Sequence, residues 1–189
     1  MLIRIFIIYI FFFNFSLNGY ASEKQSIINR LSEINNFSFN FEQVTKEKTE
    51  TGNCTLEFDK KLRCSYDDKL QKEIIINNKT LVILQKKYDK IYFYPISKSP
   101  FINILSKDKL ITLIQNSDII LNKNIELVYL DKNQKSITIF FEKKNYELIG
   151  WLIEDEFQNE IYFSLNIENI NSEIHKNHFK IPSLSREQN

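Results

Sequence analysis

The chain has few of the residues on which most enzymatic sites depend. Its 189 residues include only three glycines, two histidines and two cysteines. This leaves no glycine-rich loop for a phosphate group and little for a metal site. Lys and Arg together number 25 and Asp and Glu 24, so no charge excess steers the protein toward nucleic acid. These shortages disfavour metal-dependent and nucleotide-dependent enzymes, and we expect no catalytic residue, no metal and no cofactor.

The longest apolar run lies at the amino terminus. Arg4 precedes the apolar stretch Ile5–Phe13, and the small residues Gly19 and Ala21 stand at the −3 and −1 positions of a cleavage site after Ala21. This order is typical of a secretory signal peptide cleaved after Ala21. A membrane anchor is disfavoured because the run is shorter than the ~20 residues that span a bilayer. We therefore expect a cleaved leader over 1–21 and a single exported domain over 22–189.

The two cysteines flank a short segment whose side chains alternate as in a β-hairpin. If residues 58–60 form the loop, Leu56 faces Leu62 and Cys54 faces Cys64 on the same apolar face. Directly opposed Cα atoms can lie ~4.5 Å apart, which is within disulfide range. We predict a disulfide, with two buried free thiols as the alternative. A metal site is disfavoured because neither cysteine belongs to a Cys-x-x-Cys motif, and a catalytic thiol is the least favoured interpretation.

The remainder of the chain reads as an amphipathic helix followed by many short strands. Ile27, Leu31 and Ile34 recur at helical spacing within Ser22–Asn36, and Ser22 is the expected N-cap. Alternating phenylalanines over 37–42 then mark the first strand. Two short helical turns are expected at 101–105 and 108–114. Further strands are expected at 73–76, 80–84, 90–94, 125–130, 136–142, 146–154 and 160–168.

About ten short antiparallel strands with few helices predict a strongly curved sheet or a barrel. Several strands carry an apolar face, to which Phe37, Phe39, Phe41, Leu56, Leu62 and Tyr66 belong. Such a face must be covered, filled with side chains, or left as a cavity for an apolar ligand. The first helix and the central helical turns are natural covers. Periodicity alone does not decide whether these side chains form a core or a ligand wall.

Four segments, taken in order, resemble the LolA family of lipoprotein carriers. NFSFNFEQ at 36–43 is similar to the opening strand of the family, and NNKTLV at 77–82 is similar to a later turn and strand. YFYP at 92–95 with SPFINIL at 99–105 resembles a strand that precedes a proline-initiated lid helix. NHFKIP at 177–182 resembles the closing motif. Each motif is short, and their order and spacing carry the resemblance.

The resemblance implies a mainly β fold: an incomplete antiparallel β-barrel of about ten to eleven strands, with short helices as a lid over a hydrophobic cavity. Lys60 takes the place of the arginine that latches the lid in the family; the alternatives are Lys61 as the latch, or Lys60 as a solvated turn residue. The cavity wall would comprise Phe37, Phe39, Phe41, Leu56, Leu62 and Tyr66, and the lid would comprise Ile27, Leu31, Ile34, Phe101, Ile104 and Leu105.

The resemblance also implies a monomeric periplasmic chaperone of a Gram-negative bacterium rather than an enzyme. Its partners would be acylated lipoproteins, the inner-membrane ABC transporter that releases them and the outer-membrane receptor that accepts them. The alternative is an envelope lipid-binding or receptor module of the same fold. Receptor relatives carry a cysteine at the cleavage site, where this chain has Ser22. An exported hydrolase is disfavoured because the chain has no Gly-x-Ser-x-Gly motif.

Overall fold

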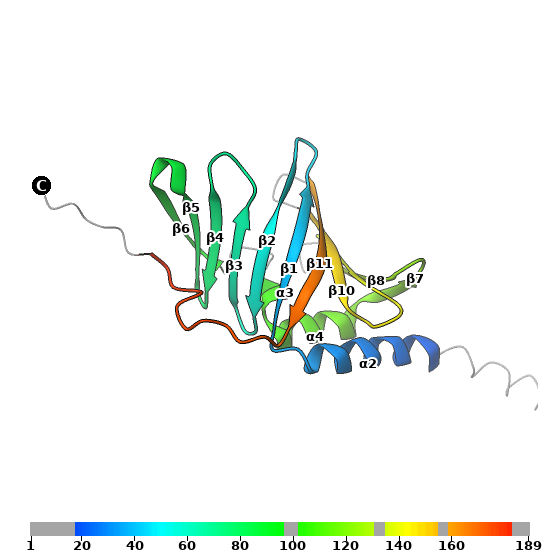
Figure 1. Ribbon diagram of the computed structural model, residues 1–189. Helices are drawn as coiled ribbons and strands as arrows, with labels where there is room; N and C mark the ends of the chain where they lie inside the picture. The colour runs from blue at the N-terminus through cyan, green and yellow to red at the C-terminus, as the bar shows by residue number, and fades with distance from the viewer. Residues whose placement is uncertain (1–17, 97–101, 131–134, 155–158, 183–189) are drawn as a thin grey trace, which may run out of the picture.

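The computed structural model describes residues 18–96, 102–130, 135–154 and 159–182, which form one large sheet with helices against it (Figure 1). The helices are α2 (Asn18–Ser32), the 3₁₀ turn η1 (Lys86–Tyr88), α3 (Ile102–Leu105) and α4 (Lys107–Asn116). The strands are β1 (Asn36–Val44), β2 (Thr49–Glu57), β3 (Lys61–Tyr66), β4 (Lys72–Asn77), β5 (Thr80–Gln85), β6 (Lys90–Pro95), β7 (Asp118–Leu121), β8 (Ile125–Leu130), β9 (Ser136–Phe141), β10 (Leu148–Glu154) and β11 (Glu160–Ile170).

All eleven strands belong to one antiparallel sheet. They pair in the order β6-β5-β4-β3-β2-β1-β11-β10-β9-β8-β7, so β6 and β7 are the two edges and the sheet is not closed into a barrel. This confirms the predicted incomplete antiparallel architecture of ten to eleven strands. Within the described part of the chain, no helix is both long enough and apolar enough to cross a membrane.

The helices cover only part of the sheet. Figure 1 shows α2 and α4 along the lower side of the molecule, next to the half that runs from β1 to β7, while β4, β5 and β6 extend away from them. Leu110 and Ile114 of α4 are fully buried, as are Phe39 of β1 and Ile139 of β9, and all four belong to one apolar cluster. The main core therefore lies between the helices and this half of the sheet.

The predicted hairpin and its disulfide are confirmed. In β2 and β3, Leu56 is paired with Leu62 and Cys54 with Cys64, in the register that alternation and cysteine spacing indicate. The two cysteines form a disulfide with Cα atoms 4.1 Å apart. Both are buried within the main core, so the bridge lies on the helix-covered face of the sheet.

A glycine at position 52 allows the side chains of this face to pack closely. Gly52 lies between Phe41 of β1 and Tyr66 of β3 in the register of the sheet. A Cβ atom there would lie 2.1 Å from the backbone oxygen of Ser65 and 2.8 Å from the ring of Phe41. These contacts are closer than packed atoms allow, so this position has no room for a side chain.

The first helix differs from its predicted bounds. It begins at Asn18 and ends at Ser32, and Ser22 lies inside it, where its carbonyl accepts a hydrogen bond from Ser26 Oγ. The predicted N-cap at Ser22 is therefore wrong. The helix stops early because Glu33 and Ile34 donate their N–H groups three residues back, in a tight turn that leads into β1.

Two strands differ from the predicted elements, and some predicted segments lie outside the described residues. β7 has no counterpart in the predicted elements, and β2 begins at Thr49, five residues before Cys54, the first residue paired in the predicted hairpin. The described residues do not include 1–17 of the expected leader, Phe101 of the expected lid, or 183–189.

Candidate functional site

The strand register lines up two rows of apolar side chains across six strands. We call these rows the inner ladders, because they share the face of the sheet that the helices cover. The first ladder runs from β1 to β6 through Phe39, Cys54, Cys64, Ile74, Ile83 and Tyr92. The second ladder runs beside it through Phe37, Leu56, Leu62, Ile76, Leu81 and Tyr94. Each ladder thus extends the predicted apolar face by three strands, as far as the edge of the sheet.

Both ladders are buried at the β1 end and exposed to solvent at the β6 end. Phe39 is 2% exposed at the β1 end of the first ladder, whereas Tyr92 is 39% exposed at the β6 end. In the second ladder, Phe37 is 3% exposed and Tyr94 is 48% exposed. We call the outer end the open apolar face, which comprises Ile74, Leu81, Ile83, Tyr92 and Tyr94.

The predicted wall and lid residues come together, but in a closed arrangement. The predicted wall residues belong to the main apolar cluster or pack against it, and five of them are between 2% and 8% exposed: Phe37, Phe39, Phe41, Leu56 and Leu62. Tyr66 is partly buried against the same cluster. The described lid residues are equally buried in that cluster: Ile27, Leu31, Ile34, Ile104 and Leu105. The helices therefore fill this part of the face with side chains.

An aromatic row closes the covered face at the level of Gly52. Trp151 stacks on Phe163 with ring centroids 4.3 Å apart, and Phe163 stacks on Phe41 at 4.9 Å. Phe41 then meets Tyr66 edge to face at 4.9 Å. Aromatic pairs of this kind contribute ~0.5–1.5 kcal/mol beyond the area they bury, so the row ties β10, β11, β1 and β3 together.

Tyr66 marks the border between this row and solvent. Its hydroxyl donates to Gln43 Oε1 at 3.4 Å, and the ammonium of Lys72 lies 3.6 Å from its ring centroid. Burial, assisted by the charges of Glu50 and Asp68, raises the pKa of the Tyr66 phenol well above its ordinary value. The phenol therefore stays neutral at physiological pH. Next to solvent, the ring of Tyr66 is flanked by the amide of Gln43 and the ammonium of Lys72.

The loop between β2 and β3 attaches the central helices to the sheet. The main-chain N–H of Lys60 donates to the carbonyl of Leu105 at 2.9 Å. Asp59 Oδ1 accepts a hydrogen bond of 2.7 Å from the N–H of Lys107, the first residue of α4. Ser106, at the N-cap position of α4, makes no side-chain cap, so a carboxylate from a distant loop takes this role.

The structure thus separates the two lysines that were candidates for a lid latch. Lys60 touches α3 through its backbone, whereas the side chain of Lys61 pairs with Glu57 at 2.5 Å on the neighbouring strand. A hydrogen bond from the main chain does not depend on the side chain at position 60. Asp59 was not among the predicted site residues, and no local pattern points to a cap from 48 residues away.

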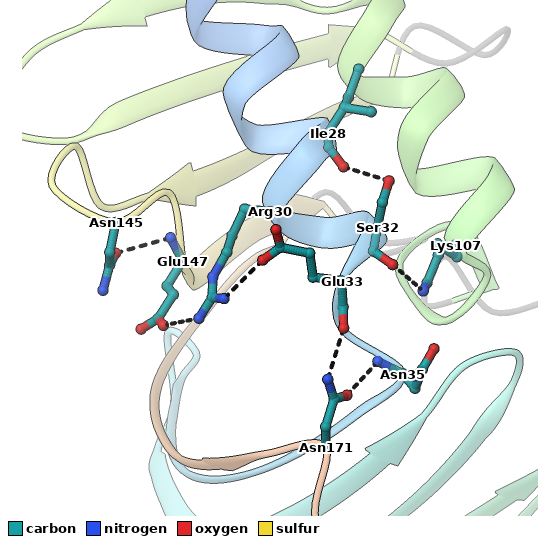
Figure 2. Close-up of polar contacts among 9 residues, drawn as sticks. All are labelled: Ile28, Arg30, Ser32, Glu33, Asn35, Lys107, Asn145, Glu147 and Asn171. Carbon is teal, nitrogen blue, oxygen red and sulfur yellow. Dashed lines mark hydrogen bonds and ion pairs between the residues drawn. The ribbon is translucent and has the colours of Figure 1, made fainter.

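The end of α2 is attached to the sheet by polar contacts at the surface, as Figure 2 shows. Arg30 pairs with Glu147 at 2.7 Å and with Glu33 at 3.3 Å. The hydrogen bond to Glu147 is the main reason that the pKa of the Arg30 guanidinium is raised. Asn171 donates to the carbonyl of Glu33 and accepts from the N–H of Asn35, both at 2.7 Å. Partly exposed contacts of this kind contribute ~0–1 kcal/mol each.

The opposite face of the sheet carries a separate charged cluster. Glu73, whose side chain is 8% exposed, pairs with Arg63 at 2.9 Å and with Lys86 at 2.5 Å. Burial alone would raise the pKa of Glu73, but the hydrogen bond from Lys86 and the nearby charge of Arg63 outweigh it and hold this pKa below its ordinary value. The carboxylate is therefore ionised and structural.

The C-terminal segment covers the outer face of β3, β4 and β5. Arg63 Nη1 donates to the carbonyl of His178 at 2.9 Å, and Asn77 Nδ2 donates to that of Phe179 at 3.2 Å. Phe179 is 6% exposed, and Ile181 packs on a small cluster of buried aliphatic side chains. The closing motif thus lies on the face opposite the inner ladders.

Comparison with known proteins gives a consistent result over most of the chain. The model of the family described as outer membrane lipoprotein carrier protein LolA matches residues 32–182. An outer-membrane lipoprotein carrier protein of Campylobacter jejuni is 29% identical over 158 residues, which are 78% of this chain and 81% of that protein.

Similar folds occur among solved structures. An uncharacterised conserved protein of Thermus thermophilus aligns with a TM-score of 0.54 at 9% identity, over 85% of this chain and 94% of that one. MucB aligns with a TM-score of 0.54 at 13% identity, over 86% of this chain and 64% of that one. At such identities the likeness shows a shared fold.

Proposed function

The chain belongs to the LolA family of outer membrane lipoprotein carrier proteins, and we propose that it is a periplasmic carrier of lipoproteins. In this proposal residues 1–21 are removed as a leader, and 22–189 form the carrier domain. The protein takes up the acyl chains of lipoproteins that an inner-membrane ABC transporter releases, and it delivers them to a receptor at the outer membrane. It acts as a monomer and makes or breaks no covalent bond.

The two inner ladders with their graded exposure are the observation that supports this proposal most directly. Each ladder is an apolar track that begins at a solvent-exposed edge strand and continues without a charged residue into the buried core. Burying acyl chains contributes ~0.8 kcal/mol per CH₂ group, so a track of this kind stabilises a lipid anchor in water. Carboxylates or metals would add nothing to such binding.

The helical cover provides a way to lengthen the track. If α3 and α4 move away from the sheet, the predicted wall residues Phe37, Phe39 and Leu56 become accessible to a ligand. The hydrogen bonds that oppose this movement at the β2–β3 loop come from Asp59 and from the backbone of Lys60. An acyl chain that replaces the helices against the ladders restores the apolar contacts that opening removes.

A release assay tests the proposal. The protein, expressed from its full-length gene and purified without detergent, is added to inner-membrane vesicles that hold a labelled triacylated lipoprotein and the active transporter. We expect a soluble one-to-one complex whose formation depends on the acyl chains. If a folded protein releases no lipoprotein in the presence of an active transporter, the carrier function is wrong. An envelope lipid-binding or receptor module of the same fold then becomes the better interpretation.

A matched pair of variants assigns the binding to the open apolar face. Ile83→Lys places a charge in the middle of this face, whereas Ile120→Lys makes the same change on the exposed part of β7, at the far edge of the sheet. We expect Ile83→Lys to lower lipoprotein retention at least ten-fold and Ile120→Lys to leave it unchanged. Equal retention by the two variants would show that acyl chains bind elsewhere.

A further inference from the structure

The β5–β6 hairpin exposes an unusual concentration of aromatic side chains. Within seven residues, Tyr88 is 55% exposed, Tyr92 39%, Phe93 51% and Tyr94 48%. These four make up half of the eight large hydrophobic residues that are exposed in the described part of the chain. Such clustering on an edge hairpin points to a contact surface rather than to chance exposure.

The aromatic rings project from both faces of the edge strand and from the hairpin tip. Tyr92 and Tyr94 end the inner ladders, while Phe93 lies opposite Val82 on the outer face. Tyr88 belongs to η1, the turn that joins β5 to β6 (Figure 1). A partner that packed on one face of the sheet would leave half of these rings in water. A medium that surrounds the edge from both sides would contact them all.

Positive charge accompanies these rings. Residues 80–95 contain three lysines and one aspartate, although the whole chain has a formal charge of only +1. Lys86 is held by Glu73, but Lys87 and Lys90 are exposed and take part in no ion pair within the described ranges. The ammonium of Lys87 lies 5.7 Å from the ring centroid of Tyr88. Aromatic rings beside free lysines match the headgroup region of an anionic bilayer.

A partner strand fits this edge less well. Lys90 begins β6 and Pro95 ends it, and both residue types are ones that discourage pairing of an edge strand with another chain. A flexible lipid surface, by contrast, needs no backbone hydrogen bonds from the edge. The chemistry of the hairpin therefore favours a bilayer as its partner.

We propose that the β5–β6 hairpin docks on the surface of an anionic phospholipid bilayer. The rings of Tyr88 and Phe93 enter the headgroup region, and Lys87 and Lys90 contact lipid phosphates. Docking places the open apolar face at the bilayer surface, because that face ends on the same strand. On the proposed carrier function, acyl chains then pass between bilayer and inner ladders with little exposure to water.

Binding to vesicles in the absence of any lipoprotein tests this proposal. Vesicles of phosphatidylethanolamine and phosphatidylglycerol are sedimented with the protein and compared with vesicles of phosphatidylcholine. We expect the protein to sediment with the anionic vesicles and to be released by about 0.5 M NaCl, since salt screens surface charge. Lys87→Gln/Lys90→Gln is expected to weaken binding about five-fold per lysine, and Tyr88→Ser/Phe93→Ser at least as much.

Matched controls make the same changes elsewhere on the surface. Lys143→Gln/Lys144→Gln removes two exposed lysines of the β9–β10 turn, and Tyr162→Ser removes a tyrosine that is 40% exposed. Hairpin variants that bind like the wild type, or controls that lose as much binding, would overturn the proposal. So would a wild-type protein that ignores anionic vesicles.

The outcomes distinguish this proposal from the carrier function. Vesicle binding needs no lipoprotein, so its absence would refute membrane docking without bearing on release of lipoprotein in the presence of the transporter. Conversely, a protein that binds anionic vesicles through the hairpin but forms no lipoprotein complex would keep the docking surface and lose the carrier role.

Discussion

Removal of the Asp59 carboxylate should loosen the helical cover of the inner ladders. Asp59 Oδ1 accepts the 2.7 Å hydrogen bond from the N–H of Lys107 and so caps α4 from another part of the chain. Replacing a capping side chain by alanine costs ~1 kcal/mol, within a range of ~0.5–2 kcal/mol. Because Asp59 joins the sheet to α4, we expect its removal to destabilise the closed position of the helices against the sheet by this amount, and not only the first turn of α4. A change of ~1 kcal/mol raises the open population about five-fold.

Two measurements report this population independently. Hydrogen exchange at the buried α4 positions Leu110, Leu113 and Ile114 should become about five-fold faster in Asp59→Ala, if exchange there proceeds through movement of the cover. The apparent affinity for a fluorescent fatty acid long enough to reach the covered part of the ladders should also rise, by up to the same factor, because only the open state exposes that part. An increase in both quantities is the specific expectation.

Two control variants separate the cap from general effects on the helix. Asp59→Asn keeps an oxygen that can accept from Lys107 and should exchange nearly as the wild type does. Asp108→Ala removes an exposed carboxylate from the first turn of α4 without touching the sheet, and it should have a smaller effect on ligand affinity. If Asp59→Ala changes neither exchange nor affinity, the β2–β3 loop does not hold the cover and the reasoning fails.

Two further predictions concern the stability of the sheet. Cys54→Ala/Cys64→Ala should lower the free energy of unfolding by about 3 kcal/mol, the chain-entropy value for a loop of about ten residues, as measured by urea denaturation. Glu73 should make stability depend on pH: its folded pKa lies below the unfolded value, so its contribution is present above about pH 4.5 and is lost as pH falls through the folded pKa. Glu73→Gln should flatten this part of the urea-midpoint profile, and an unchanged acid slope in this variant would contradict the role of the Arg63 and Lys86 pairs.

The β2–β3 hairpin could be predicted because several independent signals agree there. Alternation places Leu56 and Leu62 on one face, the cysteine pair requires the same register, and residues 58–60 suit a loop. A slip of one residue would bury the polar set and separate the cysteines. The sequence therefore specifies this element locally and almost uniquely.

β7 and the start of β2 lacked such signals. β7 is four residues long and contains three consecutive aliphatic side chains, so it shows no period of two. The first residues of β2, from Thr49 to Asn53, are mostly polar and include Gly52. Both segments are strands because a neighbouring strand pairs with them, β8 in one case and β1 in the other. Pairing with a neighbouring strand, which the pattern of one segment does not report, overrides weak local preference.

The open apolar face could not be located from the sequence for a related reason. In β6 the aromatic residues Tyr92, Phe93 and Tyr94 are consecutive, whereas in β1 phenylalanines alternate with polar residues. Both patterns predict strands with apolar side chains, and neither separates core from surface. Whether such a residue is core or surface depends on where the helices stop along the sheet. That boundary depends on the packing of α4 against β8 and against α2, which lies far from both in the sequence.

The inner face combines two requirements that oppose one another. Permanently exposed ladders from Phe37 to Tyr94 would form a large apolar patch, which promotes aggregation, whereas a fully covered face would leave an acyl chain nowhere to begin binding. The observed gradient satisfies both, since it exposes the β6 end and hides the β1 end under helices whose polar attachments lie largely at the surface.

For a carrier, the consequence is that an acyl chain first binds the open end without any rearrangement and then competes with Leu105 and its neighbours for the covered end. Affinity should therefore increase with acyl-chain length until the chain reaches the cover, and beyond that length each further CH₂ should add less than ~0.8 kcal/mol, because part of its burial free energy is offset by opening.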